Sequence, residues 1–216
     1  MILSIDTTSE FGSIALVDRA SVVEEVLLYS VDGFGHVLYE HFEHLLARHS
    51  LTVRQLDCFA AAAGPGSFTG VRVGLTAVKG LAEATGKRVV AVSNLKALAL
   101  FGSAALRATV LDARRGEVYA AVYNEMLEIV MPEAVLKYEA WAKSLPPGGF
   151  ELISPDFSTF AAHLDPATAR VTAPRALAGA IGRIAWIEFQ HGRASDPAEV
   201  DANYVRRSDA ELFWKG

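Results

Sequence analysis

The feature that most constrains the fold is a pattern that occurs twice along the chain. An apolar segment ends in aspartate at Ile5-Asp6 and again at Leu111-Asp112, and Gly12 and Gly116 each open the apolar segment that follows. Short apolar segments bounded by turn-forming residues are typical of β-strands, so each pattern predicts a strand, a hairpin and a second strand. The repetition predicts a duplicated α/β unit.

The order of the expected elements supports duplication. The first half predicts strands at 2–6, 12–17, 22–29, 58–63 and 89–92, and helices at 36–49, 69–85 and 93–101. The second half predicts strands at 109–111, 117–123, 127–130, 150–153 and 169–172, and helices at 138–144, 157–164 and 174–191. We therefore expect an α/β fold of two lobes with mixed sheets, residues 1–103 and 104–216, the C-terminal segment being free to pack back on lobe one. Such sheets place a ligand cleft between the lobes, at the strand ends that carry the two aspartates.

Charge and targeting signals narrow the function classes. The chain of 216 residues has a formal net charge of −5. This charge argues against nucleic-acid binding by the chain on its own, because phosphate binding depends on clustered Lys and Arg. Local basic spots at Arg114-Arg115 and Arg206-Arg207 are candidates for RNA contacts inside an assembly. Asp6 interrupts the apolar N-terminus and no basic segment precedes it, so a strand is expected there and not a signal peptide. We expect a cytoplasmic protein without a membrane span.

The two hairpins are candidate phosphate-binding loops. In actin-like phosphotransferases such hairpins need glycine close to the aspartate, so that backbone N–H groups can approach a phosphate. The first hairpin has no glycine before Gly12, which argues against ATP hydrolysis. Two interpretations stay open: the aspartates satisfy backbone donors in the turns, or a residual nucleotide cleft survives. The residues of that cleft would be Asp6, Thr7, Thr8, Asp112, Arg114 and Arg115.

A glycine-rich segment at residues 64–70 leads into the helix at 69–85. A loop of this kind before a helix N-terminus is a ready anion site. It is not a Walker loop, and three residues between Gly66 and Gly70 do not fit the dinucleotide fingerprint. We favour the alternative, a tight turn in which glycine allows close backbone approach.

The helix at 69–85 has three faces. An apolar face suited to cover a sheet contains Val71, Leu75, Val78 and Ala82; a face of mostly small residues contains Gly70, Gly74, Ala77, Leu81 and Ala84; a polar stripe contains Arg72, Thr76, Lys79 and Glu83. The small face permits close approach of another helix, from the same chain or from a partner.

No residue stands out as a catalytic group. His36, Glu40 and His44 form one row on the helix at 36–49 and are a possible start of a metal site, but we favour an outward, solvated or partner-facing surface, because the opposite side of that helix is apolar. No Gly-x-Ser-x-Gly elbow occurs, and Cys58 lies alone in an apolar strand, so we expect a buried, structural cysteine.

Several runs together resemble the TsaB family, also called YeaZ. They are Ile5-Asp6-Thr7, residues 64–74, Lys79-Gly80-Leu81-Ala82, residues 92–95, residues 112–119 and Tyr204-Val205-Arg206. The resemblance implies a duplicated actin/hexokinase/Hsp70-type, ribonuclease H-like fold without cofactor or catalytic activity. It also implies a scaffold subunit of the complex that forms N6-threonylcarbamoyladenosine at position 37 of tRNAs reading ANN codons. The implied partners are a TsaD-type catalytic paralogue and a TsaE-type ATPase, with tRNA only through the complex; homodimers are also possible.

The same resemblance implies a pairing surface on two helices. Its residues here are His36, Tyr39, Glu40, Glu43, Arg72, Gly74, Thr76 and Lys79. The paralogue carries His-x-x-x-His for its metal, whereas here Glu40 follows His36 at that spacing, so no metal is expected. Ala202 stands where many relatives have proline, which leaves the role of the tail open. The alternative function is an independent ATP-dependent phosphotransferase or a metal-dependent glycopeptidase-like enzyme.

Overall fold

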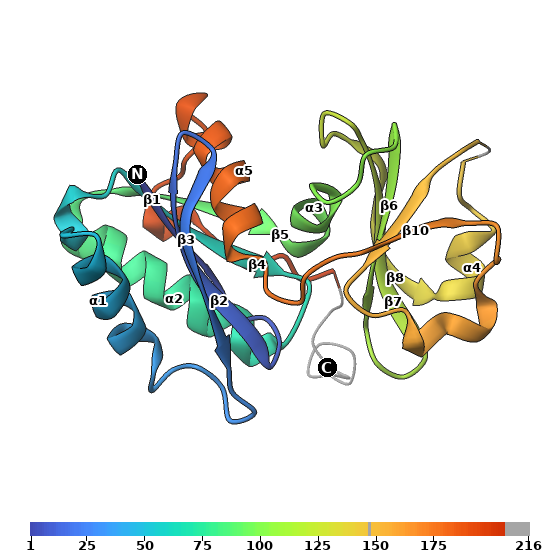
Figure 1. The fold of residues 1–216 in the computed structure, drawn as a ribbon, viewed down its shortest axis with the longest axis horizontal. Helices are drawn as coiled ribbons and strands as arrows, with labels where there is room; N and C mark the ends of the chain where they lie inside the picture. The colour runs from blue at the N-terminus through green and yellow to red at the C-terminus, as the bar shows by residue number, and fades with distance from the viewer. Residues whose placement is uncertain (147, 206–216) are drawn as a thin grey trace, which may run out of the picture. The chain divides into compact units, whose positions relative to one another are not determined.

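The computed structural model describes residues 1–146 and 148–205, and the chain forms two compact units. The first contains residues 1–97 and 175–202, and the second contains residues 98–174 and the segment from 203 onward. Each unit has its own five-stranded mixed sheet (Figure 1).

The sheet of the first unit has the strand order β3-β2-β1-β4-β5. Its strands are β1 (Ile2–Asp6), β2 (Phe11–Asp18), β3 (Ser21–Tyr29), β4 (Cys58–Gly64) and β5 (Arg88–Ser93). The strands β1, β2 and β3 form an antiparallel meander, while β4 pairs parallel to both β1 and β5. The carboxyl ends of β1 and β4 therefore lie side by side, which brings the Asp6 hairpin next to the glycine-rich loop.

Helices cover both faces of this sheet. Helices α1 (Leu38–Arg48) and α2 (Phe68–Thr85) lie on one face, and α5 (Ala178–Gln190) lies on the other (Figure 1). The predicted apolar face of α2 is buried in the main core, together with Leu3 and Ile5 of β1. Gly86 ends α2 in the left-handed conformation, with φ of 68°, as a glycine after a helix commonly does.

The second unit repeats the topology of the first. Its strands are β6 (Leu106–Asp112), β7 (Glu117–Asn124), β8 (Ile129–Lys137), β9 (Glu151–Ser154) and β10 (Ala169–Thr172), in the order β10-β9-β6-β7-β8. Its helices are α4 (Tyr138–Ala142) and the 3-10 helix η2 (Ser158–His163), which pack on one face around the buried Trp141. The duplicated, actin-like α/β fold predicted from the sequence is therefore confirmed.

Several elements differ from the prediction. Helix α5, part of the C-terminal segment that the sequence left free to pack back on lobe one, packs on the sheet of the first unit. It begins at Ala178 and not at Pro174, because its first amides are held by side chains of that sheet. The sequence pattern also missed the short 3-10 helices η1 (Val53–Gln55) and η3 (Pro197–Glu199), and it made β8 too short. Helix α3 (Asn94–Ala99) spans the boundary of the units. None of the helices in the described parts of the chain has the length and apolar character needed to cross a membrane.

Candidate functional site

Asp6, at the end of β1, is enclosed and fully engaged. The side chain is 1% exposed. One carboxylate oxygen accepts the Thr8 N–H at 3.0 Å and the Thr8 hydroxyl at 2.7 Å, and the other accepts the Leu177 N–H at 3.2 Å. Burial raises the pKa of Asp6 above its ordinary value, against the effect of the Thr8 and Leu177 donors. Asp6 thus satisfies backbone donors, as the turn interpretation predicted, and a metal ion or phosphate would have to displace these contacts.

The N-terminal turn of α5 donates its amides to the protein itself. The Ala178 N–H donates to the Ser13 hydroxyl at 2.9 Å, and the Gly179 N–H donates to Glu25 at 3.0 Å. The Ser13 hydroxyl in turn donates to the same Glu25 oxygen at 2.8 Å. The unpaired amides at a helix N-terminus are what an anion would use. Here two strands of the sheet supply the acceptors, so this helix start offers no open anion site.

The glycine-rich loop packs directly against the first hairpin. The Ser67 N–H donates to the Thr8 carbonyl at 2.7 Å, and the Thr7 hydroxyl donates to the Gly70 carbonyl at 2.7 Å. A Cβ placed on Gly70 would lie 2.0 Å from the Thr7 carbonyl oxygen, and one on Gly66 would lie 2.7 Å from the Thr8 side chain. The glycines therefore serve close backbone approach, which confirms the turn interpretation of this loop.

Asn94 connects the hairpin to the start of the loop. Its side-chain oxygen accepts the Gly64 N–H at 3.0 Å, and its amide donates to the Thr8 hydroxyl at 2.7 Å. The chain of hydrogen bonds continues from Thr8 to Asp6 and is buried throughout. Ser93 caps the start of α3, because its hydroxyl accepts the Leu95 N–H at 3.1 Å.

The second hairpin is open by comparison. The Asp112 carboxylate accepts the Arg114 N–H at 2.8 Å. Arg114, Arg115 and Gly116 follow one another with φ of 64°, 58° and 74°, a left-handed conformation that only glycine adopts without strain. The hairpin lines a pocket of about 570 Å³ within the second unit. Of the predicted nucleotide residues, those in the first unit are enclosed, whereas Arg114 and Arg115 are exposed. The other predicted basic spot, Arg206-Arg207, lies outside the described residues.

The eight residues of the predicted pairing surface differ in their exposure to solvent. Six of them are exposed on or just before α1 and on α2: His36, Tyr39, Glu40, Glu43, Arg72 and Thr76. Gly74 is buried, and a Cβ there would lie 2.7 Å from the Thr7 hydroxyl oxygen. The Lys79 ammonium group donates to the Val200 carbonyl at 2.8 Å. The part of the small face around Gly74 is therefore internal, because α2 docks on the first hairpin there.

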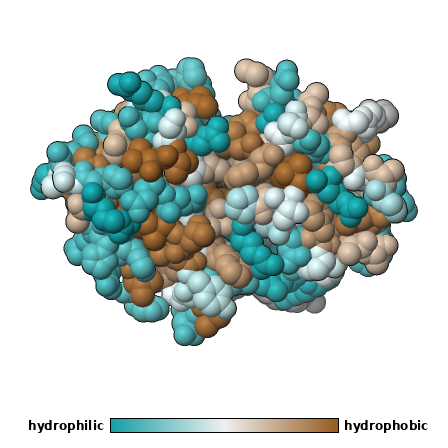
Figure 2. Space-filling view, viewed as in Figure 1, coloured by the Kyte–Doolittle hydropathy of each residue, from teal (hydrophilic) through white to brown (hydrophobic). Residues whose placement is uncertain are grey.

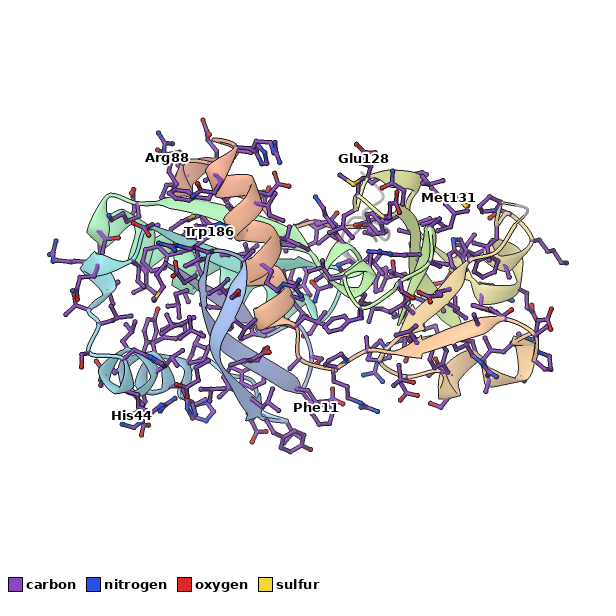
Figure 3. The ribbon with its side chains drawn as sticks, turned by 45° about the horizontal axis from the view of Figure 1, so that its top comes forward. Phe11, His44, Arg88, Glu128, Met131 and Trp186 are labelled. Atoms are coloured by element: carbon purple, nitrogen blue, oxygen red, sulfur yellow. The ribbon has the colours of Figure 1, made fainter. Side chains whose placement is uncertain are left out.

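Neither metal binding nor thiol chemistry finds a site among the described residues. No group of three His, Cys, Asp or Glu side chains has the arrangement for a metal ion within that part of the chain. His44 is exposed on the outer side of α1, away from the sheet (Figure 3). This position agrees with the interpretation of His36, Glu40 and His44 as an outward-facing row. Burial raises the pKa of the Cys58 thiol to about 12, so the thiolate is absent at neutral pH.

Sequence reasoning missed Ser13 and Glu25 as members of the buried network. Ser13 lies between Gly12 and Ile14 in a buried strand, whereas Glu25 follows Glu24 in the half-exposed strand β3. A buried polar side chain such as Ser13 requires a hydrogen-bonding partner. That requirement was the available signal, although it does not identify the partner.

Comparisons with known proteins agree with this architecture. A family model described as "TsaD: tRNA N6-adenosine threonylcarbamoyltransferase" matches residues 35–168. A protein of Bacillus subtilis (strain 168), named "tRNA threonylcarbamoyladenosine biosynthesis protein TsaB", is 34% identical over 149 residues, which cover 67% of this chain and 65% of that protein. The protein of the same name from Escherichia coli (strain K12) is 34% identical over 146 residues, covering 64% of this chain and 63% of its own. The matches thus span less than two thirds of these relatives.

The solved structure titled "YeaZ from Pseudomonas aeruginosa" is similar over nearly the whole chain. The TM-score is 0.80 at 25% sequence identity, and the alignment covers 94% of this chain and 98% of that one. The likeness therefore extends over both units.

Proposed function

Since the chain belongs to the TsaD family of tRNA N6-adenosine threonylcarbamoyltransferases and their relatives, we propose that it is a TsaB-type, non-catalytic subunit in the formation of N6-threonylcarbamoyladenosine. In this role it supports a TsaD-type catalytic paralogue that modifies position 37 of tRNAs reading ANN codons. It acts in the cytoplasm, in a complex that a TsaE-type ATPase joins and through which tRNA is bound.

The observation that carries the non-catalytic role is the closed state of the Asp6 hairpin. A phosphotransferase of actin-like fold needs backbone N–H groups and a carboxylate that face the phosphates and their metal ion. Here the Asp6 carboxylate is saturated by Thr8 and by the start of α5, and Gly70 packs on Thr7. An independent phosphotransferase or metallopeptidase finds no comparable support in the described residues.

The exposed part of the predicted pairing surface supports a role in protein association. Tyr39 is 54% exposed on α1, next to the exposed Glu40 and Glu43, and Arg72 and Thr76 are exposed on α2. Figure 2 shows apolar patches among hydrophilic surface on the face viewed there, and the exposed apolar side chains of the first unit include Leu27, Tyr29 and Val31. Exposed aromatic anchors with charged neighbours are typical of protein interfaces. We propose that this surface pairs with the paralogue or with a second copy.

The test combines association with activity. The purified chain is mixed with the paralogue of its own organism that carries His-x-x-x-His, and complex formation is measured by size-exclusion chromatography with light scattering. Threonylcarbamoylation of tRNA is then measured with and without the chain. We expect a heterodimer at micromolar concentration and a reaction that depends on it. Tyr39→Glu combined with Thr76→Glu should weaken pairing, while Arg183→Glu on α5 serves as a matched charge control. Turnover of ATP or stoichiometric metal in the chain alone would overturn the proposal.

A further inference from the structure

The pocket in the second unit gathers donors that the fold does not use. It has a volume of about 570 Å³ and lies between the β6–β7 hairpin, the junction of β8 with α4, and η2. Arg114, Lys137, Tyr138 and His163 are among its lining residues. The volume is in the range of natural ligand sites. We propose that this pocket binds a phosphate group, held by Arg114 and Lys137.

The two cations are available for a ligand. Arg114 and Lys137 are exposed, and neither side chain has an ion pair or hydrogen bond within residues 1–146 and 148–205. A guanidinium and an ammonium group that line one pocket suit a phosphate, because charge-assisted hydrogen bonds to phosphate oxygens are short and strong.

The hydroxyl group of a tyrosine adds a third donor. Tyr138 lines the pocket and is 7% exposed, and its ring stacks on Phe160 with a centroid distance of 4.7 Å. Its hydroxyl has no hydrogen-bond partner within the described part of the chain. Among the described residues Trp141 Nε1 is the buried side-chain atom without a partner, so the Tyr138 hydroxyl is open to solvent and is free to donate to a ligand in the pocket.

The acidic residues of the lining are mostly engaged elsewhere. The pocket has three cations, Arg114, Arg115 and Lys137, and three acids, Asp112, Glu117 and Glu139. Glu139 contacts His163 at 2.7 Å, and Asp112 accepts the Arg114 N–H. Arg115 and Glu117 have interactions of their own within the protein. A ligand therefore meets the charges of Arg114 and Lys137, together with the carboxylate of Asp112, which keeps its charge while it accepts the backbone N–H.

The hairpin conformation is a second, independent observation. Arg114 and Arg115 both hold the left-handed conformation, which costs free energy for residues other than glycine. Such strain persists where it places a side chain that matters, and asparagine or glycine would have formed this turn more easily. The proposed phosphate would account for an arginine, and not a glycine, at position 114.

The phosphate has two chemical sources, a free nucleotide or the backbone of RNA. The proposed function provides RNA, and this assignment of the source rests on it. With a neutral lining, the pocket supplies one phosphate contact and not a binding surface of its own, so the contact would add to RNA binding by the assembled complex. The acidic chain alone is expected to bind RNA weakly.

The experiment measures binding of an unmodified tRNA transcript by fluorescence anisotropy, using the full chain in complex with its paralogue and the full chain alone. Arg114→Gln and Lys137→Gln should each weaken tRNA binding by the complex about tenfold, and each should reduce the slope of log affinity against log salt by about 0.7 to 0.9. Lys143→Gln and Arg183→Gln remove exposed cations outside the pocket and should change neither quantity. Arg114→Gly should weaken binding as much as Arg114→Gln while raising the thermal stability of the chain.

A second arm titrates ATP and inorganic phosphate into the chain alone by calorimetry. If these ligands bind, and the pocket variants remove that binding without affecting tRNA, the phosphate site is correct and its source is a nucleotide. If tRNA, ATP and phosphate all bind the variants as they bind the unaltered chain, the phosphate site is wrong. Complex formation with the paralogue is recorded for every sample. If the chain pairs with the paralogue but the pocket variants bind every ligand like the unaltered chain, only this inference is refuted. If the chain does not pair with the paralogue, the proposed function is refuted.

Discussion

Two glycines of α2 provide a matched test of how the glycine-rich loop works. Gly70 and Gly80 lie on the same helix, but a Cβ on Gly70 would meet the Thr7 carbonyl oxygen at 2.0 Å, whereas a Cβ on Gly80 would have nothing within 4 Å. Alanine is favoured over glycine in a helix by about 0.5–1 kcal/mol. We therefore expect Gly80→Ala to raise the free energy of unfolding by about that amount.

At Gly70 the same substitution should have the opposite effect. Inserting a methyl group into a packed site costs about 1–3 kcal/mol, and here the opposing atom belongs to the backbone, which cannot rotate away. Moving the hairpin would also stretch the hydrogen bond from the Thr7 hydroxyl to the Gly70 carbonyl, worth about 1 kcal/mol. After the helical gain of alanine is subtracted, Gly70→Ala should lower the free energy of unfolding by about 1–3.5 kcal/mol.

The measurement is urea denaturation followed by circular dichroism and tryptophan fluorescence, with both variants and the unaltered chain under one set of conditions. A change in midpoint at constant slope reports stability. Gly70→Ala with a midpoint equal to or above that of the unaltered chain would show that the loop does not depend on close approach to the hairpin. An unchanged Gly80→Ala would mean instead that the helix preference assumed for alanine is not realised in α2.

Three further outcomes follow from side chains whose environment is equally defined. Asn94→Ala should cost about 2–4 kcal/mol in urea denaturation, because it leaves the buried Gly64 N–H unpaired at about 1–3 kcal/mol and removes the hydrogen bond to the Thr8 hydroxyl at about 1 kcal/mol; stability within error of the unaltered chain would contradict this. Hydrogen bonds from Arg48 and His49 lower the pKa of Glu24 below its ordinary value of 4.5, so its contribution is present above that pH and lost as pH falls through the folded value. The difference in stability between the unaltered chain and Glu24→Gln should therefore shrink on acidification, and a constant difference would refute the coupling. Arg114→Gly should raise the free energy of unfolding by about 1 kcal/mol, since glycine holds a φ of 64° without strain; a loss of stability would mean that the arginine side chain supports the fold.

The sequence predicted those parts of the fold that depend on the pattern of neighbouring residues. The strands β1, β2 and β4, the helix α2 and its end at Gly86 each follow from a few neighbouring residues. Duplication was visible because Asp6 and Asp112 end equivalent strands, and the two sheets indeed share one topology. Local patterning predicted α5 as a helix but not its first residue, and it left open which of the two sheets the helix covers.

The site depended on contacts that no local pattern specifies. Leu177 lies 171 residues from Asp6, and Asn94 lies 86 residues from Thr8. Each residue type had a plausible local role, as turn former or helix cap, so the sequence kept both a nucleotide site and a structural turn open for Asp6. Gly74 was assigned to a shared surface for a similar reason: a small residue permits close approach, but the helix pattern does not say whether a partner or the Thr7 hydroxyl comes close.

The two copies of the duplicated hairpin have diverged in chemistry while keeping one backbone plan. In the first, the Leu177 N–H at the start of α5 donates to the aspartate, and Gly70 of α2 packs on the turn. The polar groups of this hairpin are therefore hydrogen-bonded within the protein. In the second, the equivalent aspartate holds only its own turn, and the arginine that follows stays exposed in a strained conformation. Under the proposed function this difference has a direct interpretation: a closed first hairpin accounts for the absence of turnover that we propose. The exposed second hairpin accounts for the phosphate contact that we propose in the pocket of the second unit.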